Sequence, residues 1–468
     1  MSTSGAIAYI ERHRPRFLGE LKEFVRFPTV SAQPRHAADL QRCASWLAAH
    51  LRGIGLSRVN VVKTALHPLV YAESRREPGR QTVLIYGHYD VQPPDPLHEW
   101  RSPPFDPVVS GGNLYGRGAC DDKGQMFAHV KAIEAHLSEG RTLPVNVKCL
   151  FEGEEEIGSP NLARFLAENR DTLAAEVAIV SDMPMLGPGR PAITYSMRGG
   201  LSLELEVAGP ERDLHSGIFG GAIHNPLQAL CEIIAGLHGP DGRVTIPGYY
   251  DSVKSWRPDE RRYMAEAGPD DRKILKDAGV SDGWGESRYS LYERTTIRPA
   301  ITVNGFTGGY QGPGGKGVIP SRARAKLSIR LAPGQDPKEI ERLFRLHVER
   351  LTPPTVRCKI RATQGAKPAL VSRRLSAMRA AALAYRKGFG ASPVFLRSGG
   401  TIPVVNTFQE LLGIPTILMG FALPDDGMHG PNEKFQLSNF YDGIAASIWF
   451  LASIGKGPEK AERKECSS

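Results

Sequence analysis

Cysteine is scarce in this chain of 468 residues, and the six cysteines lie far apart. No two of them form a Cys-x-x-Cys pair, so neither a disulfide scaffold nor a four-cysteine zinc site is indicated. This usage is typical of a reducing compartment. The first thirty residues carry too many charges for the apolar segment of a secretory signal. We therefore expect a cytoplasmic protein.

Long hydrophobic runs and long tracts of one charge are also missing. The apolar stretch 444–454 is too short to cross a bilayer, so we expect no membrane association. Lysine and arginine exceed aspartate and glutamate by nine (59 − 50), but they are scattered in short groups with no nucleic-acid-binding motif beside them. We therefore expect a solvated basic surface and no nucleic-acid partner.

Motifs of two common enzyme classes are missing as well. No Gly-x-Ser-x-Gly sequence occurs, which argues against a serine-hydrolase elbow. Residues 312–317 have Gly-x-Gly-x-x-Gly spacing, but no predicted strand and helix flank them as a dinucleotide-binding unit requires. We interpret this segment as a flexible substrate loop.

Short apolar runs alternate with amphipathic helices in the first 198 residues. Apolar residues recur every three or four positions in 37–51 and 127–137, as in helices, and continuous apolar runs occupy 82–86, 145–151, 177–180 and, later, 416–419. Continuous runs are typical of strands buried on both faces. The pattern predicts an α/β fold with a mixed, mostly parallel sheet flanked by helices.

The pattern changes near residue 199. Segments 201–207 and 325–331 alternate as strands with one exposed face, and helical segments follow each of them. We therefore predict an inserted α+β domain over 199–364, between a first part of the main domain at 1–198 and a second part at 365–468. The polar segment 247–294 receives no assignment.

Acidic residues and histidines follow directly after four of the predicted strands. The runs lead into His88 and Asp90, into the acidic group 152–156, into Asp182 and, through a loop, to His429. In open α/β sheets the ligand crevice lies outside the carboxyl ends of the strands. We therefore expect these four segments to converge.

Several carboxylates buried together need a cation, because unpaired buried charge costs many kcal/mol. Imidazole and carboxylate donors without a thiolate cluster favour zinc, with manganese and cobalt as alternatives. His88 and Asp90 point the same way on an extended segment, so Asp90 can hold the His88 imidazole. Singly, each motif has an ordinary interpretation, such as a solvated acidic turn for 154–156. Their coincidence predicts a metal site.

Five motifs resemble, in order, those of a family of two-metal zinc peptidases. This family includes cytosolic dipeptidases, acetylornithine deacetylase, succinyl-diaminopimelate desuccinylase, carboxypeptidase G and aminoacylase. The motifs are Gly87–Pro93, Gly116–Gly124, Glu152–Ser159, Asp213–Gly217 and Met428–Glu433. The resemblance covers nearly the whole chain. It implies that 1–198 and 365–468 form a catalytic domain, that 199–364 is a lid and dimerisation domain, and that the protein is a homodimer.

The resemblance also implies two divalent metal ions and their ligands. His88 and Asp182 would bind one ion, Glu156 and His429 the other, and Asp121 would bridge the two. Such a pair of ions lowers the pKa of a shared water and polarises the scissile carbonyl group. Glu155 would then be the general base that passes a proton to the leaving amine, and Asp90 would support His88.

Four further residues are implied to bind substrate. His215 would stabilise the tetrahedral oxyanion across a dimer interface. Arg330 would bind the free carboxylate of the substrate, which suits the planar fork of a guanidinium group. Asn304 and Thr401 are weaker candidates of the same kind. From the residues alone, His215 lies in a polar turn and Arg330 is a strand residue facing solvent, and those alternatives stay open.

The predicted reaction is hydrolysis of the amide bond of dipeptides or small peptides with a free C-terminal carboxylate. A deacylase of N-acyl amino acids is the alternative, and a non-catalytic binding relative is another, against which the retained Glu155 argues. Two departures from the family pattern remain. Cys120, beside Asp121, is interpreted as a small buried filler rather than an oxidation sensor. Gly430 follows His429 where many relatives carry serine.

Overall fold

The computed structural model describes residues 3–138, 142–362 and 365–456. The chain forms two compact units. The first comprises Met1–Tyr195, Val371–Phe395 and Thr407–Ser468, and the second comprises Ser196–Leu370 and Leu396–Asn406. The second unit thus begins three residues before the expected position 199, and the expected end at 364 lies outside the described residues. Residues 396–406, which the sequence pattern assigns to the main domain, belong to the second unit.

A large mixed sheet forms the centre of the first unit. Its strand order is β1-β2-β6-β3-β7-β17-β8-β15, and β16 also pairs with β8. The strands are β1 (Arg58–Val62), β2 (Leu69–Glu73), β3 (Thr82–His88), β6 (Asn146–Glu152), β7 (Val177–Val180), β8 (Ala192–Met197), β15 (Ala369–Leu370), β16 (Val394–Ser398) and β17 (Thr416–Met419). The neighbours β6-β3-β7-β17 run parallel, and the pairs β1-β2, β2-β6, β17-β8 and β8-β15 are antiparallel. The boundary between the units falls within β8 and within β16, and β15 belongs to the second unit.

The parallel strands are buried along their whole length, which explains their continuous apolar sequences. Every residue of β7 and β17 is buried, as is all of β3 except Thr82. A strand that is covered on both faces of the sheet has no side facing solvent, so its sequence does not alternate between apolar and polar residues. These strands confirm the predicted α/β class and its mixed sheet.

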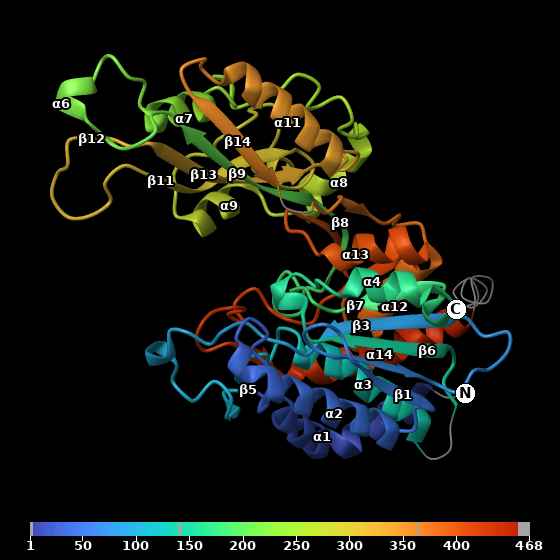
Figure 1. The fold of residues 1–468 in the computed structure, drawn as a ribbon. Helices are drawn as coiled ribbons and strands as arrows, with labels where there is room; N and C mark the ends of the chain where they lie inside the picture. The colour runs from blue at the N-terminus through green and yellow to red at the C-terminus, as the bar shows by residue number, and fades with distance from the viewer. Residues whose placement is uncertain (1–2, 139–141, 363–364, 457–468) are drawn as a thin grey trace. The chain divides into compact units, whose positions relative to one another are not determined.

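Helices cover this sheet. They are α1 (Thr3–Val25), α2 (Ala37–Gly53), α3 (Lys123–Leu137), α4 (Leu162–Glu168), α5 (Arg170–Leu173), α12 (Ser376–Gly388) and α14 (Leu437–Gly455), with short turns η1 (Pro34–His36), η2 (Leu97–Glu99), η4 (Glu155–Ile157) and η5 (Phe408–Leu412). Helix α13 (Pro403–Thr407) crosses the unit boundary. Figure 1 shows α1, α2 and α3 on one side of β3 and β6 and α4 on the other. Within the described ranges, no helix has the length and apolar character needed to cross a membrane.

Helix α3 is buried on all sides rather than on one face. All residues from Lys123 to His136 are buried, because α3 packs against β3 and is covered by α1 and α14. The apolar spacing in 127–137 predicts an amphipathic helix with a solvent face, and that part of the prediction is wrong. The polar residues of this helix are instead satisfied inside the protein, as described below.

A small sheet joins two loops of the first unit. Strands β4 (Val108–Ser110), β5 (Asn113–Tyr115) and β18 (Lys434–Gln436) pair in the order β18-β5-β4. Tyr115 lies opposite Lys434. The segments that follow β5 and precede β18 are therefore brought side by side although they are far apart in the sequence.

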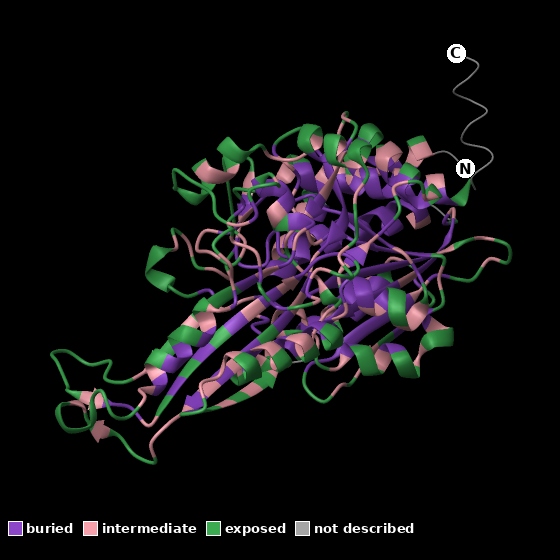
Figure 2. Cartoon of the chain, turned by 90° about the horizontal axis from the view of Figure 1, so that it is seen from above, coloured by how far each residue is buried: buried purple, intermediate pink, exposed green. Residues whose placement is uncertain are grey.

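The second unit is built on an antiparallel sheet of order β11-β13-β9-β14. Its elements are β9 (Gly199–Ala208), β11 (Ala300–Gly308), β13 (Arg322–Leu331), β14 (Arg357–Ala362), α7 (Pro226–Ala235) and α11 (Pro337–Leu351), with the smaller β10 (Leu214–His215), α6 (Ser216–Phe219) and β12 (Val318–Ile319). Alternate residues of β9 and β13 are buried under α7 and α11. Figure 2 shows this alternation along the long strands.

The segment without an assignment contains three short helices. They are α8 (Pro258–Ala267), α9 (Asp271–Ala278) and α10 (Leu291–Thr296). Met264, Tyr292 and Ile297 form a small apolar cluster, with Trp256 and Ile274 packed against it. So few apolar anchors on short, charged helices give no clear periodic signal in the sequence.

Candidate metal centre

The ends of the parallel strands carry the candidate ligands, as the sequence pattern predicts. His88 is the last residue of β3 and pairs with Glu152, the last residue of β6. Asp182 follows β7 by two residues, and His429 lies on the loop after β17. Because these strands are parallel neighbours, their carboxyl ends lie at one edge of the sheet. The start of α3 brings Asp121 to the same edge.

The five candidate ligands form two groups that share one carboxylate. In the first group, Nε2 of His88 lies 3.2 Å from Oδ1 of Asp121 and 3.8 Å from Oδ2 of Asp182. In the second, Nε2 of His429 lies 2.9 Å from Oδ2 of Asp121 and 3.4 Å from Oε2 of Glu156. In each group, one ligand atom per residue lies within 4.8 Å of the others. Asp121 therefore presents one oxygen to each group.

The titration behaviour of these groups shows that the cluster attracts positive charge. Burial raises the pKa of Asp182 well above its usual range, and the nearby Asp121 raises it further. Burial alone would lower the pKa of His88, but its interactions with Asp121 and Asp90 raise that pKa well above its usual value. Asp121 and Glu156 raise the pKa of His429 to about 10. A divalent cation bound here would balance the negative charge of these carboxylates in place of bound protons.

One buried nitrogen is left without a hydrogen bond. Although Nε2 of His88 lies 3.2 Å from Asp121, it makes no hydrogen bond to any of the described residues, and its side chain is fully buried. A buried polar atom of this kind calls for a further partner such as an ion or a water. The two imidazoles and three carboxylates form a donor set that fits a pair of divalent metal ions, and the free Nε2 of His88 is one of these donors.

Asp90 supports the site in a way that differs from the expectation. Nδ1 of His88 hydrogen-bonds the backbone carbonyl oxygen of Asp90 at 3.1 Å, whereas the Asp90 carboxylate is 3.5 Å from that nitrogen. The carboxylate instead accepts the backbone N–H groups of Glu155 at 3.2 Å and of Glu156 at 3.0 Å. Asp90 thus links the histidine to the acidic turn.

The acidic turn η4 holds Glu155 and Glu156 with different surroundings. Glu156 accepts a hydrogen bond from Nε2 of Gln92 at 2.8 Å, so one of its oxygens is fixed. Burial raises the pKa of Glu155 to about 7, and Glu156 and Asp90 add to the rise while His88 opposes it. A carboxylate with a pKa near neutrality suits general acid–base chemistry.

Glu154 is a structural residue of the site that sequence reasoning missed. It is buried, not part of a solvated turn. Its carboxylate accepts the hydroxyl of Thr64 at 2.8 Å, the backbone N–H of His67 at 2.8 Å, and both the side-chain amide and the backbone N–H of Asn161, at 2.9 and 3.2 Å. Glu154 thereby ties two flanking segments to the turn that carries Glu155. A run of three acids cannot place all its side chains on one ligand, but the sequence does not show which of them is buried.

The four predicted substrate residues lie in the second unit. Arg330 on β13 donates from Nη1 to the Thr401 hydroxyl at 3.1 Å, and that hydroxyl donates to the carbonyl oxygen of Arg198 at 2.8 Å. Asn304 on β11 donates to the Ser328 hydroxyl at 2.9 Å. The structure thus brings Arg330 and Thr401 into direct contact.

His215 lies apart from those contacts. It is exposed on β10, opposite Val318, and its Nδ1 accepts the backbone N–H of Gly217 at 3.0 Å. This leaves Nε2 of His215 as the nitrogen available to donate a hydrogen bond.

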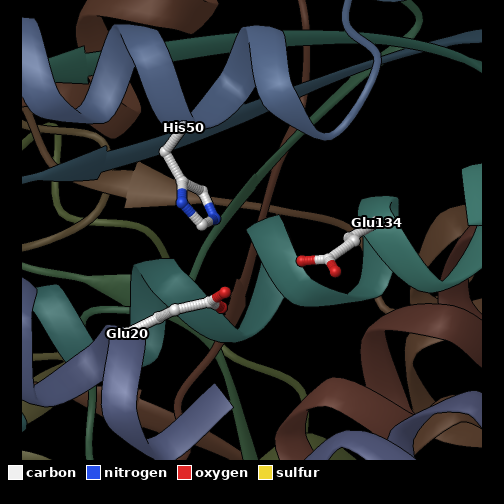
Figure 3. A group of neighbouring side chains, drawn as sticks. All are labelled: Glu20, His50 and Glu134. Atoms are coloured by element: carbon white, nitrogen blue, oxygen red, sulfur yellow. The ribbon is translucent and has the colours of Figure 1, made fainter. Parts of the chain in front are cut away.

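A third group of candidate metal ligands, Glu20, His50 and Glu134, lies between α1, α2 and α3. Figure 3 shows these three side chains pointing toward one another. The ammonium group of Lys131 already occupies their centre, at 2.5 Å from Glu20, 2.7 Å from Glu134 and 2.7 Å from Nε2 of His50. Burial and this lysine lower the pKa of His50 to about 4, so His50 is a neutral acceptor. Lys131 is therefore the cation of this group.

Cysteine plays no part in the candidate ligand groups of the described residues. Cys120, beside Asp121, is fully buried, and burial raises the pKa of its thiol well above the ordinary value. The five described cysteines are free, and Cys466 lies outside the described residues.

The chain belongs to the protein family described as Peptidase family M20/M25/M40, which residues 84–451 match. This result confirms the predicted family and the predicted class, a dipeptidase-like metallopeptidase. The chain is 32% identical over 470 residues to the Cys-Gly metallodipeptidase dug1 of Schizosaccharomyces pombe, with 95% of this chain and 96% of that protein covered. It is 31% identical to the human Beta-Ala-His dipeptidase, with 96% of this chain and 92% of that protein covered.

Solved structures agree with these sequence relationships. The crystal structure of human carnosine dipeptidase 1 matches with a TM-score of 0.82 at 30% identity, covering 97% of this chain and 99% of that chain. The M20 family metallo-carboxypeptidase Sso-CP2 of Sulfolobus solfataricus matches with a TM-score of 0.85 at 33% identity, covering 94% of this chain and 99% of that chain. The fold is therefore that of M20 peptidases.

Proposed function

We propose that this protein hydrolyses the amide bond of dipeptides or small peptides that carry a free C-terminal carboxylate. The observation that carries this proposal is the shared carboxylate of Asp121, which faces one ligand group with each oxygen. The relatives at about 30% identity over nearly their whole length, named as Cys-Gly and Beta-Ala-His dipeptidases, support the dipeptide substrate class.

We assign the metal ligands as the family resemblance implies. His88 and Asp182 would hold one divalent ion, Glu156 and His429 would hold the other, and Asp121 would offer one oxygen to each. Zinc is the expected metal, with manganese and cobalt as alternatives. When bound, such ions lower the pKa of a coordinated water and polarise a carbonyl oxygen.

The remaining chemistry belongs to the chain. Glu155 accepts the proton of the attacking water and delivers it to the amine that leaves, a role that its raised pKa supports. Asp90 keeps the His88 imidazole oriented through its carbonyl oxygen and fixes the Glu155 turn through its carboxylate. Gln92 holds one oxygen of Glu156.

Substrate recognition is assigned to the second unit. Arg330 binds the free carboxylate of the substrate, with Thr401 and Asn304 beside it on that unit, and His215 donates to the developing oxyanion. Arg330 suits this role because its fork forms two parallel hydrogen bonds to a carboxylate. The first unit would then be catalytic, and the second a lid and dimerisation domain of a homodimer, which light scattering would test. The free cysteines support a cytoplasmic location.

The deciding experiment is a substrate panel with purified protein that is stripped of metal and reloaded with zinc, manganese or cobalt. The panel contains dipeptides, the same dipeptides with an amidated C-terminus, and N-acyl amino acids. We expect metal-dependent cleavage of free dipeptides and at least tenfold lower kcat/KM on the amides. Preferred cleavage of N-acyl amino acids would make the protein a deacylase. Two bound metal ions without turnover on any substrate would favour a binding protein.

A further inference from the structure

Arg117 and Glu433 form an ion pair inside the first unit, next to the candidate metal centre. Nη1 of Arg117 donates to Oε2 of Glu433 at 2.7 Å. Both side chains are almost completely buried, with 1% and 0% of their surfaces exposed. Neither residue is among the candidate ligands, and the proposed chemistry does not use them.

The Glu433 carboxylate holds the loop that carries Asp121. Its Oε1 accepts the backbone N–H groups of Cys120 at 2.9 Å and of Asp121 at 3.1 Å. Its Oε2 accepts the backbone N–H of Gly118 at 2.9 Å, in addition to the Arg117 guanidinium. Four donors on one buried carboxylate fix this loop from inside the protein.

The second nitrogen of the Arg117 guanidinium holds the loop that carries His429. Nη2 donates to the carbonyl oxygen of His429 at 3.0 Å and to that of Gly430 at 3.1 Å. His429 has a backbone φ of 63°, in the left-handed region that residues other than glycine rarely adopt. Such a conformation persists only where the surroundings enforce it, and the two carbonyl contacts from Arg117 do so.

We propose that Arg117 and Glu433 are positioning residues that set the spacing between Asp121 and His429. They thereby determine the affinity of the Asp121–Glu156–His429 group for its metal ion. The pair connects the backbone of one ligand to the backbone of the other, whereas a buried ion pair by itself adds little stability. This inference rests on the proposed metal-dependent function and adds two residues that neither coordinate metal nor touch substrate.

Arg117→Lys is the sharpest test because it keeps the charge and shortens the reach. One ammonium group cannot donate to Glu433 and to two carbonyl oxygens in the geometry of a guanidinium fork. We would titrate metal-free protein with Co²⁺ and follow its visible absorption together with calorimetry. The wild type should bind two equivalents. In the variant, one equivalent should bind within threefold of wild type and the other should bind 10–100-fold more weakly.

Two further variants calibrate this titration. His429→Ala removes a ligand of the affected group, so it should weaken the same equivalent as Arg117→Lys. Arg298→Lys is the matched control, because Arg298 forms a partly buried, two-bond ion pair with Glu286 in the second unit. That control should bind both equivalents as the wild type does. Turnover of Arg117→Lys should recover at Co²⁺ concentrations that fill the weakened group.

The outcomes separate this inference from the proposed function. A wild type that does not bind two equivalents contradicts the two-metal function itself. The inference is overturned if the wild type binds two equivalents of Co²⁺ and Arg117→Lys binds both with unchanged affinity. Equal weakening of both equivalents in Arg117→Lys also overturns it. If Arg117→Lys does not fold, Glu433→Gln is measured in its place, because its amide would set an N–H group against donors of the loop that carries Asp121. Both groups share Asp121, so weaker binding of both equivalents is expected there, and two unchanged affinities overturn the inference.

Discussion

Nε2 of His429 lies 2.9 Å from Oδ2 of Asp121, although the two residues come from opposite halves of the sequence. The other oxygen of Asp121 faces His88 at 3.2 Å. This carboxylate lies between two imidazoles, one at the end of β3 and the other on the loop after β17, and simpler packing would stabilise the protein as well. It does provide two adjacent sites for cations, and the predictions below test what the surrounding residues contribute.

Replacement of Glu155 by glutamine should abolish turnover while leaving metal binding intact. The amide cannot accept the proton of the attacking water, and loss of a general base costs about 10²–10⁴-fold in kcat. Measurement of kcat on a dipeptide and of bound metal by elemental analysis checks this on one preparation. Glu168→Gln, an exposed change in the same unit, is the control. Activity close to wild type in the Glu155 variant would refute the assignment.

Replacement of Glu154 by glutamine should reduce both stability and turnover. Glutamine keeps one acceptor oxygen but points an N–H group at donors from Thr64, His67 or Asn161. A buried donor left without an acceptor costs about 1–3 kcal/mol. Urea unfolding and kcat, measured together, would show both effects.

Thr64→Val provides a graded comparison for that variant. It removes one of the hydrogen bonds to Glu154 together with the contacts of the same hydroxyl to the carbonyl oxygen of His67 and the N–H of Leu66, so the expected loss of unfolding free energy is about 0.5–1.5 kcal/mol for each hydrogen bond lost. If Glu154→Gln were no less stable than Thr64→Val, Glu154 would not hold the two segments together.

The ligand positions were predictable because strand ends carry a local signal. A continuous apolar run followed at once by a histidine or an acid marks the carboxyl end of a buried strand, and topology then brings such ends together. His88 and Asp182 follow this rule directly. His429 follows it through a loop, whereas Asp121, which precedes α3, was placed by the resemblance to a family.

The supporting contacts were not predictable because they join distant segments. The sequence around Glu154 is equally consistent with a solvated turn, and only the approach of Thr64 and Asn161 distinguishes the two. Likewise, the expectation that the Asp90 carboxylate holds His88 follows from strand alternation, but this carboxylate lies 3.5 Å from Nδ1 of His88 and accepts the backbone N–H groups of the acidic turn instead. Residues 396–406 join the second unit through Thr401 and Arg198, a contact with no local sequence signal.

Replacement of Arg330 by methionine should raise KM for free dipeptides with little change in kcat. A hydrogen bond to a charged group is worth about 1.5–3 kcal/mol, which corresponds to roughly 10–100-fold in KM. C-terminally amidated dipeptides should show no such increase. Arg322→Met, on the same strand and exposed, is the control. An equal increase for free and amidated substrates would remove Arg330 from carboxylate recognition.

His129 should make the protein less stable in acid. It is fully buried between the hydroxyl groups of Ser181 and Ser447, at 2.7 and 2.9 Å. Burial lowers its pKa from 6.5 to about 3, so the folded protein keeps this ring neutral where the unfolded chain protonates it. The contribution is complete above pH 6.5 and is lost as the pH falls toward 3, at up to about 1.4 kcal/mol per pH unit.

His129→Gln isolates that contribution, because every other titrating group is shared with the wild type. Urea unfolding at pH 7, 6, 5 and 4.5 should show the wild type losing stability more steeply below pH 6.5. An exposed variant, His98→Gln, should follow the wild type at each pH. Parallel curves for wild type and His129→Gln would show that this histidine titrates alike in both states.

Lys131 should behave as the built-in cation of the Glu20–His50–Glu134 group. In a buffer containing a chelator, both Lys131→Ala and Lys131→Met should destabilise the protein by about 3–5 kcal/mol, because they remove the buried ammonium group that Glu20 and Glu134 share and leave only the partly exposed Arg16 as their counter-charge. Thermal unfolding of both variants against wild type measures this loss. A variant as stable as wild type would mean that Arg16, which also contacts Glu134, compensates for the missing ammonium group.

The two variants then differ in the space that they leave. Alanine vacates the centre that two carboxylates and one neutral imidazole surround, whereas methionine fills it with an apolar chain of similar length. Zinc can enter the first and not the second, and a ligand that binds only the folded state raises its stability. Added zinc should therefore raise the melting temperature of Lys131→Ala by several degrees more than it raises that of wild type or Lys131→Met. An equal rise in all three would place the zinc effect at the Asp121 groups alone and would show that the ammonium group does not stand in for a metal ion.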